Sequence, residues 1–398
     1  MTEAEFLVRL RRLPLHPGAL DLRDDAARLG DLVLTTDTLV EGVHYLSSDP
    51  AGDVAWKLVA TNLSDLAAKG AVPVGVMLNY PLRASSLSYR ASPAEAGAQL
   101  RDDYDEGQPD VTSANSTGPR PSPGKREGEE GGGWDSAFSP SCACPAEDGA
   151  QLRDDHGEGQ PDVTSATSTG PRPSPGKRVE GEDSDWDAAF LRGFGHALTS
   201  FSASLLGGDT VSLPAHAPRV ITLTAIGRSA TAPIRSGARA GDALYVTGTI
   251  GDAGAGLRIA QGQEGPAELL AAYRRPQPRL VAGRALGSVV SAMMDVSDGL
   301  LIDAQRMAAA SGLAVTLDLA AIPLSDGYRA FAGDDRTARL AAATAGDDYE
   351  LLFAATPDGT LPCAATRIGW FAAGTGLAIV DDGAPIPLPG NLGFQHNG

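Results

Sequence analysis

The chain has little cysteine, little positive charge and no long hydrophobic run, and each shortage excludes a class of protein. Its three cysteines, Cys142, Cys144 and Cys363, are too few for a disulfide-stapled fold. The Cys-Ala-Cys spacing is also tighter than the usual two-residue zinc spacing. We therefore predict that all three are reduced and non-catalytic. Lys and Arg number 32 against 50 Asp and Glu, giving a formal net charge of -18, which argues against a nucleic-acid surface of basic patches.

No apolar run approaches the roughly 20 residues that span a bilayer. The first 20 residues contain Arg9, Arg11 and Arg12 without a following apolar stretch of signal-peptide length. The default expectation is a soluble cytoplasmic protein without a membrane partner. A hydrophobic fraction of 42% in 398 residues supports a globular chain with two or more full cores.

One long segment differs from the rest in composition. Residues 84–184 are dominated by Pro, Gly, Ser, Asp and Glu and have almost no apolar periodicity, which predicts a disordered insertion. The segment contains a tandem duplication, because the stretch that begins at Pro93 returns from Pro145. Ordered structure is expected to resume near Trp186.

Outside the insertion, strand and helix patterns alternate, which predicts an α/β or α+β fold with two domains of mixed sheet packed with helices. We place the domains at residues 1–230 and 231–398. The spacing of apolar residues predicts helices over 3–12, 53–69, 190–205 and 300–310, and strands over 72–80, 220–225 and 314–317.

Acidic residues recur at the ends of these elements. The stretch 32–44 begins as a strand whose alternation puts Thr35 and Asp37 on one face, where hydroxyl and carboxylate oxygens together suit a hard cation. An Asp after a strand is more often a turn or cap residue. Similar acidic residues recur, however, in Asp24-Asp25, Asp65, Gly207-Gly208-Asp209 and Asp295-Val-Ser-Asp298-Gly.

Each of these groups also has a purely structural interpretation. Asp65 could form a surface pair with Lys69, four residues later on the same helix. Asp209 is predicted on a tight loop, and the glycines before it could be only a helix C-cap and turn. Ser297 or Asp298 could be only the N-cap of the next helix. Glycine-rich 251–256 does not match the dinucleotide-binding spacing, and we interpret it as a loop or a helix start.

The acidic set favours one reaction class over others. Neither a phosphate-binding Gly-x-x-x-x-Gly-Lys-[Ser/Thr] loop nor a protein-kinase His-Arg-Asp set is present, and no nucleophile has an obvious base. Several carboxylates suit several Mg²⁺ ions that bridge phosphates. Phosphoryl transfer is the reaction in which positioning and charge neutralisation contribute most of the catalysis.

In order and residue type, the acidic segments resemble those of the thiamine-monophosphate kinase family, in the aminoimidazole-ribonucleotide-synthetase-like superfamily. The resemblance covers nearly all of the chain outside the insertion. The matching segments are Asp24-Asp25-Ala-Ala, Thr35-Thr-Asp-Thr-Leu-Val-Glu-Gly-Val-His44, Asn62-Leu-Ser-Asp-Leu-Ala-Ala68, Gly207-Gly-Asp-Thr210, Arg235-Ser-Gly-Ala238, Val246-Thr-Gly-Thr249, Asp295-Val-Ser-Asp-Gly299 and Gly346-Asp-Asp-Tyr-Glu-Leu351.

The resemblance implies transfer of the ATP γ-phosphoryl group to thiamine monophosphate, giving thiamine diphosphate and ADP. It also implies a homodimer whose N-terminal domains join sheets across a two-fold axis, which would cover open sheet edges. The implied Mg²⁺ ligands are Asp25, Thr35, Thr36, Asp37, Asp65, Asp209, Asp295 and Asp298. The implied ATP contacts are Arg235 and Ser297, and the implied thiamine monophosphate contacts are His44, Asp347 and Phe394.

The chain departs from the family pattern at three positions. Arg23 stands where the family usually has Gly, Asp347 where it has Glu, and Lys69 where it has an apolar residue. Two alternatives remain. Another ATP-dependent synthetase of the superfamily is one, although the N-terminal catalytic Cys or Lys of selenophosphate synthetase and the terminal Cys of the hydrogenase-maturation dehydratase are not found. A non-catalytic acidic Ca²⁺-binding or scaffolding protein is the other, and would use the same aspartates without turnover.

Overall fold

The computed structural model describes residues 3–83 and 182–395, which belong to one compact unit. The duplication, Cys142 and Cys144 lie outside the described residues, as does nearly all of the predicted insertion. Helix α4 already begins at Glu182, so the last three residues of the predicted insertion are helical. Cys363 is a free, partly buried thiol. Within the described ranges, no helix is long and apolar enough to cross a membrane.

The first sheet has five strands in the order β1-β2-β5-β3-β4, and only the β3–β4 pair is parallel. In its third strand, β5, buried Ile221, Leu223 and Ala225 alternate with more exposed residues, so one sheet face forms a core and the other stays open. The strands are β1 Ala27–Leu29, β2 Leu32–Val40, β3 Val72–Arg83, β4 Leu205–Leu213 and β5 Val220–Arg228. The strand predicted from residue 32 is confirmed as β2. The strands predicted over 72–80 and 220–225 are also confirmed, and each runs three residues further.

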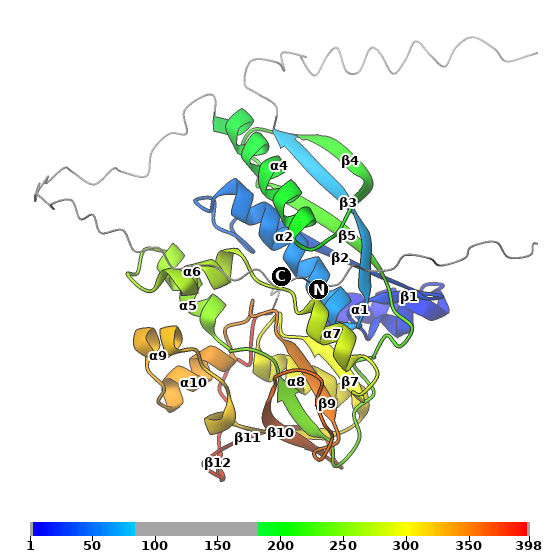
Figure 1. Ribbon diagram of the computed structural model, residues 1–398, viewed down its shortest axis with the longest axis vertical. Coiled ribbons are helices and arrows are strands. Elements are labelled where there is room, and N and C mark those ends of the chain that lie inside the picture. Colours follow the sequence, from blue (N-terminus) through cyan, green and yellow to red (C-terminus); the bar gives the residue numbers. More distant parts are fainter. Residues whose placement is uncertain (1–2, 84–181, 396–398) are drawn as a thin grey trace, which may run out of the picture. The chain divides into compact units, whose positions relative to one another are not determined.

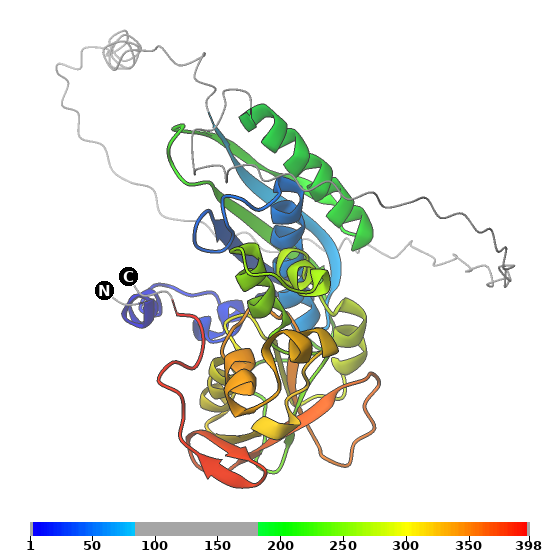
Figure 2. The ribbon, with the colours of Figure 1, turned by 90° about the vertical axis from the view of Figure 1, so that its left-hand side faces the viewer.

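Two helices pack on the core face of this sheet (Figures 1 and 2). They are α2 Ala51–Ala68 and α4 Glu182–Ser200. The predicted α2 is confirmed, but the predicted extension of α4 to Leu205 is wrong. The chain leaves the helix because Ser202 adopts a left-handed φ of 54°, and the amide of Ala203 donates back to the carbonyl of Leu198 at 2.9 Å. This is the backbone pattern of a Schellman C-cap.

The predicted tight loop at Asp209 is also wrong. Asp209 lies inside the edge strand β4, opposite Asn79 of β3. Only glycine fits at the preceding position 208, because a Cβ atom there would lie 1.8 Å from the carbonyl oxygen of Leu78. The glycine permits close pairing of two strands rather than a turn.

The second sheet has seven strands in the order β12-β11-β8-β10-β6-β9-β7 and is packed on both faces. In its β6 strand, Leu244 and Val246 join one core with α8, whereas Ala243 and Tyr245 join another that includes the C-terminal end of α2. The strands are β6 Ala243–Val246, β7 Ala292–Asp295, β8 Ala314–Asp318, β9 Leu351–Ala355, β10 Thr366–Ala372, β11 Gly376–Asp381 and β12 Ala384–Ile386.

The mixed sheets with their helices confirm the α/β (α+β) class. Helix α5 begins directly after Gly251, as the helix-start interpretation of that segment predicts. The two sheets use residues 27–228 and 243–386, and the domain boundary at 230/231 stays a prediction. The remaining helices are α1 Glu3–Leu10, η1 Pro17–Leu22, α5 Asp252–Ala260, α6 Ala267–Arg274, α7 Leu280–Leu286, α8 Leu300–Ser311, η2 Leu319–Ala321, α9 Asp326–Ala332 and α10 Arg336–Ala343.

The close approach of α2 and α4 makes a testable prediction. A Cβ atom at Gly193 of α4 would lie 2.4 Å from the Cα of Gly52 in α2, so Gly193→Ala should destabilise the protein by about 1–3 kcal/mol through overpacking. Gly195→Ala is the matched control, because nothing lies within 4 Å of its Cβ position and Ala favours a helix by about 1 kcal/mol. Melting temperatures should fall for the first variant and not for the second. Equal shifts would contradict this account of the helix contact.

Candidate active site

A cavity of about 550 Å³ opens where β2 and α2 meet the loops that follow β7 and precede β9. Its walls combine acidic, apolar and aromatic side chains from segments far apart in the sequence. Among its lining residues are most of the predicted site residues, namely Thr36, Asp37, His44, Asp65, Asp295, Ser297, Asp298, Asp347 and Phe394.

Strand β2 presents two of the predicted ligands toward α2. Thr35 and Asp37 stand opposite Ala225 and Leu223 on the core-facing side of the sheet, as the alternation predicts. The backbone amide of Asp37 donates to Oδ1 of Asn62 at 3.1 Å, which fixes the strand against the helix. The Thr36 hydroxyl is on the opposite face, where it donates to the carbonyl of Leu223 at 3.0 Å.

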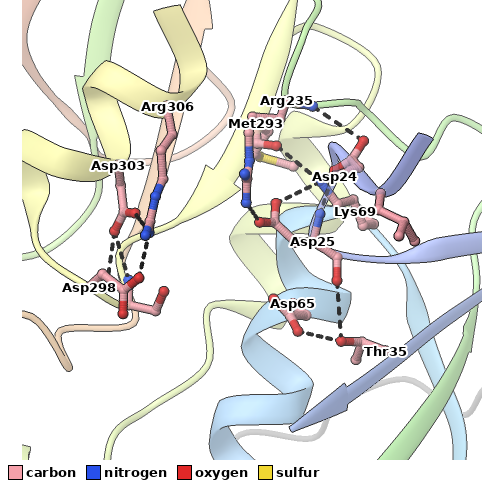
Figure 3. A network of polar contacts seen from close by, with 12 residues as sticks. Asp24, Asp25, Thr35, Asp65, Lys69, Arg235, Met293, Asp298, Asp303 and Arg306 are labelled. Atoms are coloured by element: carbon pink, nitrogen blue, oxygen red, sulfur yellow. Dashed lines mark hydrogen bonds and ion pairs between the residues drawn. The ribbon is translucent and has the colours of Figure 1, made fainter. Parts of the chain in front are cut away.

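Asp65 projects from α2 into the same region (Figure 3). The hydroxyl of Thr35 donates to Asp65 Oδ2, and also lies 3.4 Å from the carbonyl oxygen of Asp25. The alternative of a surface pair between Asp65 and Lys69 is wrong. The Lys69 side chain is only 3% exposed, and its ammonium group pairs with Asp24 and Asp25 instead.

Among the described residues, no Lys or Arg forms an ion pair with Asp37, Asp65 or Asp295, although the nearby charge of Lys69 opposes the rise in the pKa of Asp65 and Asp295. Burial, followed by the negative charge of Asp298, raises the pKa of Asp37 to about 6. Burial is also the main cause that raises the pKa of Asp295 to about 6. Burial and the charges of Asp37 and Asp295 raise the pKa of Asp65 well above its ordinary value. The set therefore favours binding of positive charge.

The loop after β7 is shaped by an aspartate that the sequence interpretation missed. Asp303 Oδ2 accepts from the backbone amides of Ser297 at 3.1 Å, Asp298 at 3.1 Å and Gly299 at 3.3 Å. The N-cap alternative for Ser297 and Asp298 is wrong, because Gly299 is the N-cap residue of α8. Arg306 of α8 bridges the carboxylates of Asp303 and Asp298 (Figure 3).

The far end of the cavity is built around Lys57 of α2. Its Nζ donates to Asp347 Oδ2 at 2.7 Å and to the carbonyl of His44 at 3.2 Å. The Tyr349 hydroxyl donates to the other carboxylate oxygen of Asp347 at 3.0 Å. Nδ1 of His44 accepts from the amide of Val40 at 3.0 Å, so a neutral imidazole carries its hydrogen on Nε2.

The segment that carries Asp347 has an unusual backbone. Asp347 and Tyr349 both have positive φ, 63° and 51°, which side-chain-bearing residues rarely adopt. The conformation is held by the amide of Asp347, which donates to Ser297 at 2.7 Å, and by the amide of Tyr349, which donates to Val296 at 2.8 Å. Strain of this kind costs about 1–3 kcal/mol per residue and concentrates at functional sites.

Four predicted residues are outside the cavity lining. Asp25 and Thr35 adjoin Asp65 through the Thr35 hydroxyl, and Arg235 adjoins them because its guanidinium pairs with Asp25. Asp209 is not brought to the cavity within the described single chain. Its carboxylate accepts from the neighbouring amide of Thr210 at 2.9 Å on the exposed strand β4.

Lys57, Asp303 and Tyr349 are the main residues that sequence reasoning missed. One signal was available for Lys57. A lysine within a mostly apolar helical pattern requires a polar partner once the helix is buried, and Lys57 is spaced by multiples of four residues from Asp65 and Lys69. No comparable local signal identifies Asp303, because only the tertiary structure shows that its carboxylate turns back to the preceding loop.

The donor set fits a divalent metal bound together with a phosphate ligand. Among residues 3–83 and 182–395, no three His, Cys, Asp or Glu side chains converge to form a complete metal cage. Mg²⁺ does not require one, because it usually keeps several waters and takes one or two carboxylates plus phosphate oxygens. The uncompensated carboxylates Asp37, Asp65 and Asp295 are the residues that fit this role.

The raised pKa values predict how the metal-free protein depends on pH. Between 3.8 and about 6 the folded chain binds more protons at Asp295 than the unfolded chain does. The free energy of unfolding therefore falls as pH rises from the unfolded pKa to just above the folded pKa, and the part of this fall between pH 5 and pH 7 is about 1 kcal/mol for this group. In EDTA, thermal melting should show that Asp295→Asn weakens this decrease, whereas Asp334→Asn at an exposed position leaves it unchanged. An identical pH dependence in wild type and Asp295→Asn would refute the assignment.

Two family models match the chain. Residues 23–100 and 171–229 match the N-terminal domain of AIR synthase related proteins, and residues 239–382 match the C-terminal domain. The thiamine-monophosphate kinase of Caulobacter vibrioides is 31% identical over 99% of this chain and 91% of its own length.

Solved structures share the fold at lower identity. A ThiL structure complexed with AMPPCP and TMP has a TM-score of 0.66 and 21% identity, covering 100% of this chain and 97% of its own. The hydrogenase maturation protein HypE in complex with ATP has a TM-score of 0.56 and 17% identity, covering 97% of this chain and 93% of its own. The fold alone is thus common to proteins with different names. The 31% identity to the Caulobacter vibrioides protein over nearly the whole chain is what separates them. On that 31% identity, this chain belongs to the thiamine-monophosphate kinase family of AIR synthase related proteins.

Proposed function

We propose that this protein transfers the γ-phosphoryl group of ATP to thiamine monophosphate with the assistance of Mg²⁺, giving thiamine diphosphate and ADP. The observation that carries the proposal is one cavity lined both by Asp37, Asp65 and Asp295, which form no ion pair among the described residues, and by His44, Asp347 and Phe394. Relatives named thiamine-monophosphate kinase and the related ThiL complex with an ATP analogue and TMP support the choice of substrates.

The acceptor of this reaction is itself a phosphate, which is already largely ionised near neutral pH, so no strong general base is required. The physical difficulty is to bring two polyanions together, and bound Mg²⁺ would supply the positive charge that screens them. Asp37, Asp65 and Asp295 would hold the metal, with Asp298 beside them. Arg306 and Asp303 fix the loop of Ser297 and Asp298, so these side chains are positioned before the substrates bind.

The opposite end of the cavity would hold the organic part of the acceptor. Lys57 and Tyr349 fix both carboxylate oxygens of Asp347, so this carboxylate is oriented without a ligand. Phe394 is 41% exposed and offers an apolar ring at the cavity wall. The Asp347 charge is paired with Lys57, so Asp347 would then offer oriented carboxylate oxygens, rather than net negative charge, to the thiazolium end of thiamine monophosphate.

The homodimer is part of the same proposal. Strand β4 is an exposed sheet edge, and its side chains Leu205, Leu206 and Val211 are all more than half exposed. Exposed apolar side chains on an open edge favour pairing with another chain. A partner strand here would also surround Asp209, whose predicted role as a ligand has no support within one chain.

The first test is product formation. Purified full-length protein with ATP, Mg²⁺ and thiamine monophosphate should form thiamine diphosphate, measured by chromatography. Asp37→Asn should lower the rate by about 100-fold or more, because a charge that positions the reacting phosphates is lost. Asp334→Asn, an exposed aspartate outside the cavity, is the control and should keep the wild-type rate. Absence of product from folded wild-type protein would reject the proposed reaction.

The second test is the oligomeric state. Val211→Asp places a charge on the 55% exposed β4 edge and should weaken the dimer by about tenfold or more, seen as a shift toward monomer in light scattering. Val281→Asp is the matched control, because Val281 is 82% exposed on α7 instead of β4. A monomeric wild-type protein, or a Val211→Asp variant that stays fully dimeric, would exclude pairing through β4.

A further inference from the structure

Lys69 is a buried lysine at the acidic end of helix α2. Its side chain is 3% exposed, and the two carboxylates beside it, Asp24 and Asp25, are 4% and 9% exposed. Figure 3 shows the ammonium group between these carboxylates and the backbone of Met293 in β7. A lysine this deeply buried is costly unless opposite charges and acceptors surround it. Here they do.

The hydrogen-bonding capacity of this ammonium group is used up within the protein. An ammonium has three N–H donors. Lys69 has three acceptors, which are Asp24 Oδ1, Asp25 Oδ2 at 3.1 Å and the carbonyl oxygen of Met293 at 3.3 Å. No donor remains for a phosphate group in the cavity. The role of Lys69 is therefore directed toward Asp24 and Asp25 rather than toward a substrate.

The charges at this end of the acidic region balance. Asp25 also pairs with the guanidinium of Arg235, and Asp24 Oδ2 accepts from the Arg235 amide at 3.4 Å. Two carboxylates are thus matched by two cations from the chain itself. A divalent metal added here would meet both cations at close range. Asp37, Asp65 and Asp295, in contrast, have no Lys or Arg within ion-pair distance in the part of the chain that the structure describes.

We propose that the Lys69 ammonium is a permanent cation in place of a divalent metal at Asp24 and Asp25, so that this pair, including the predicted ligand Asp25, binds no metal in this protein. Metal binding is then confined to the carboxylates on the cavity side, Asp37, Asp65 and Asp295. Only this second half of the statement rests on the proposed function.

The test counts metal ions. Metal-free full-length protein is titrated with Mn²⁺, and free Mn²⁺ is measured by electron paramagnetic resonance, with and without AMPPCP. Lys69→Met should bind one more ion per chain than wild type, because the vacated carboxylates Asp24 and Asp25 become a site. Lys57→Met removes the other buried lysine of α2, which pairs with Asp347, and should leave the count unchanged. Lys69→Met combined with Asp24→Asn should lose the added ion.

A stability measurement accompanies the count. Lys69→Met should melt at a lower temperature than wild type in EDTA, and Mg²⁺ should restore more of its melting temperature than Mg²⁺ adds to wild type. Equal ion counts in wild type and folded Lys69→Met would overturn the proposal. So would a Lys69→Met variant that Mg²⁺ cannot stabilise while the double variant folds normally. If wild type binds no Mn²⁺ even with AMPPCP, the proposed metal-assisted reaction fails, whereas the difference between wild type and Lys69→Met still decides the role of Lys69.

Discussion

The burial of helix α2 between the two sheets is the constraint on which the rest of the structure depends. One side of the helix packs on the five-stranded sheet, and its C-terminal Ala67 and Ala68 join the core of the seven-stranded sheet. Any polar side chain on such a helix must find a partner inside the protein. The helix and the cap that follows it carry these side chains at four-residue intervals, in the order Lys57, Thr61, Asp65 and Lys69. The partners lie on segments around the cavity, so the contacts that satisfy the buried helix are the same contacts that position the site residues.

The polar residues along this helix differ in their hydrogen-bond and ion-pair partners, so the charge balance changes from one end of the cavity to the other. Lys57 at one end is paired with Asp347, and Lys69 at the other with Asp24 and Asp25. Asp65 between them forms no ion pair within the described part of the chain; it accepts from the Thr35 hydroxyl, and burial with the charges of Asp37 and Asp295 raises its pKa despite the opposing charge of Lys69. Positive charge is therefore favoured in the middle of the cavity, where a phosphate with its metal would lie. The cost of these close carboxylates is offset elsewhere by the large apolar cores of both sheets.

The shared fold does not by itself determine the reaction, since related folds serve proteins with different names. What can distinguish this chain lies in a few side chains around its cavity. The strained Asp347 segment, held by Lys57 and Tyr349, shapes the end where an acceptor would bind. At the opposite end, the Lys69 ammonium adds a positive charge beside Asp24 and Asp25. Asp347 and Lys69 are single-residue departures from the family pattern. Both act through buried charges, where a single charge has a large effect.

Strand alternation, helical spacing and acidic residues after strands are local properties, so the fold class, several helices and strands and the acidic character of the site could be predicted from the sequence. Thr35 and Asp37 on one face of β2, and the α/β class, follow from such patterns. Local patterns were less successful for partners. The predicted loop at Asp209 proved wrong, and so did two structural alternatives, the pairing of Asp65 with Lys69 and an N-cap at Ser297 or Asp298. The actual partners depend on the three-dimensional arrangement: Thr35 of another element for Asp65, the turned-back Asp303 carboxylate for the loop of Ser297, and strand β3 for Asp209. Local patterns indicate where polar side chains lie along the elements, whereas burial and tertiary contacts determine their hydrogen-bond and ion-pair partners.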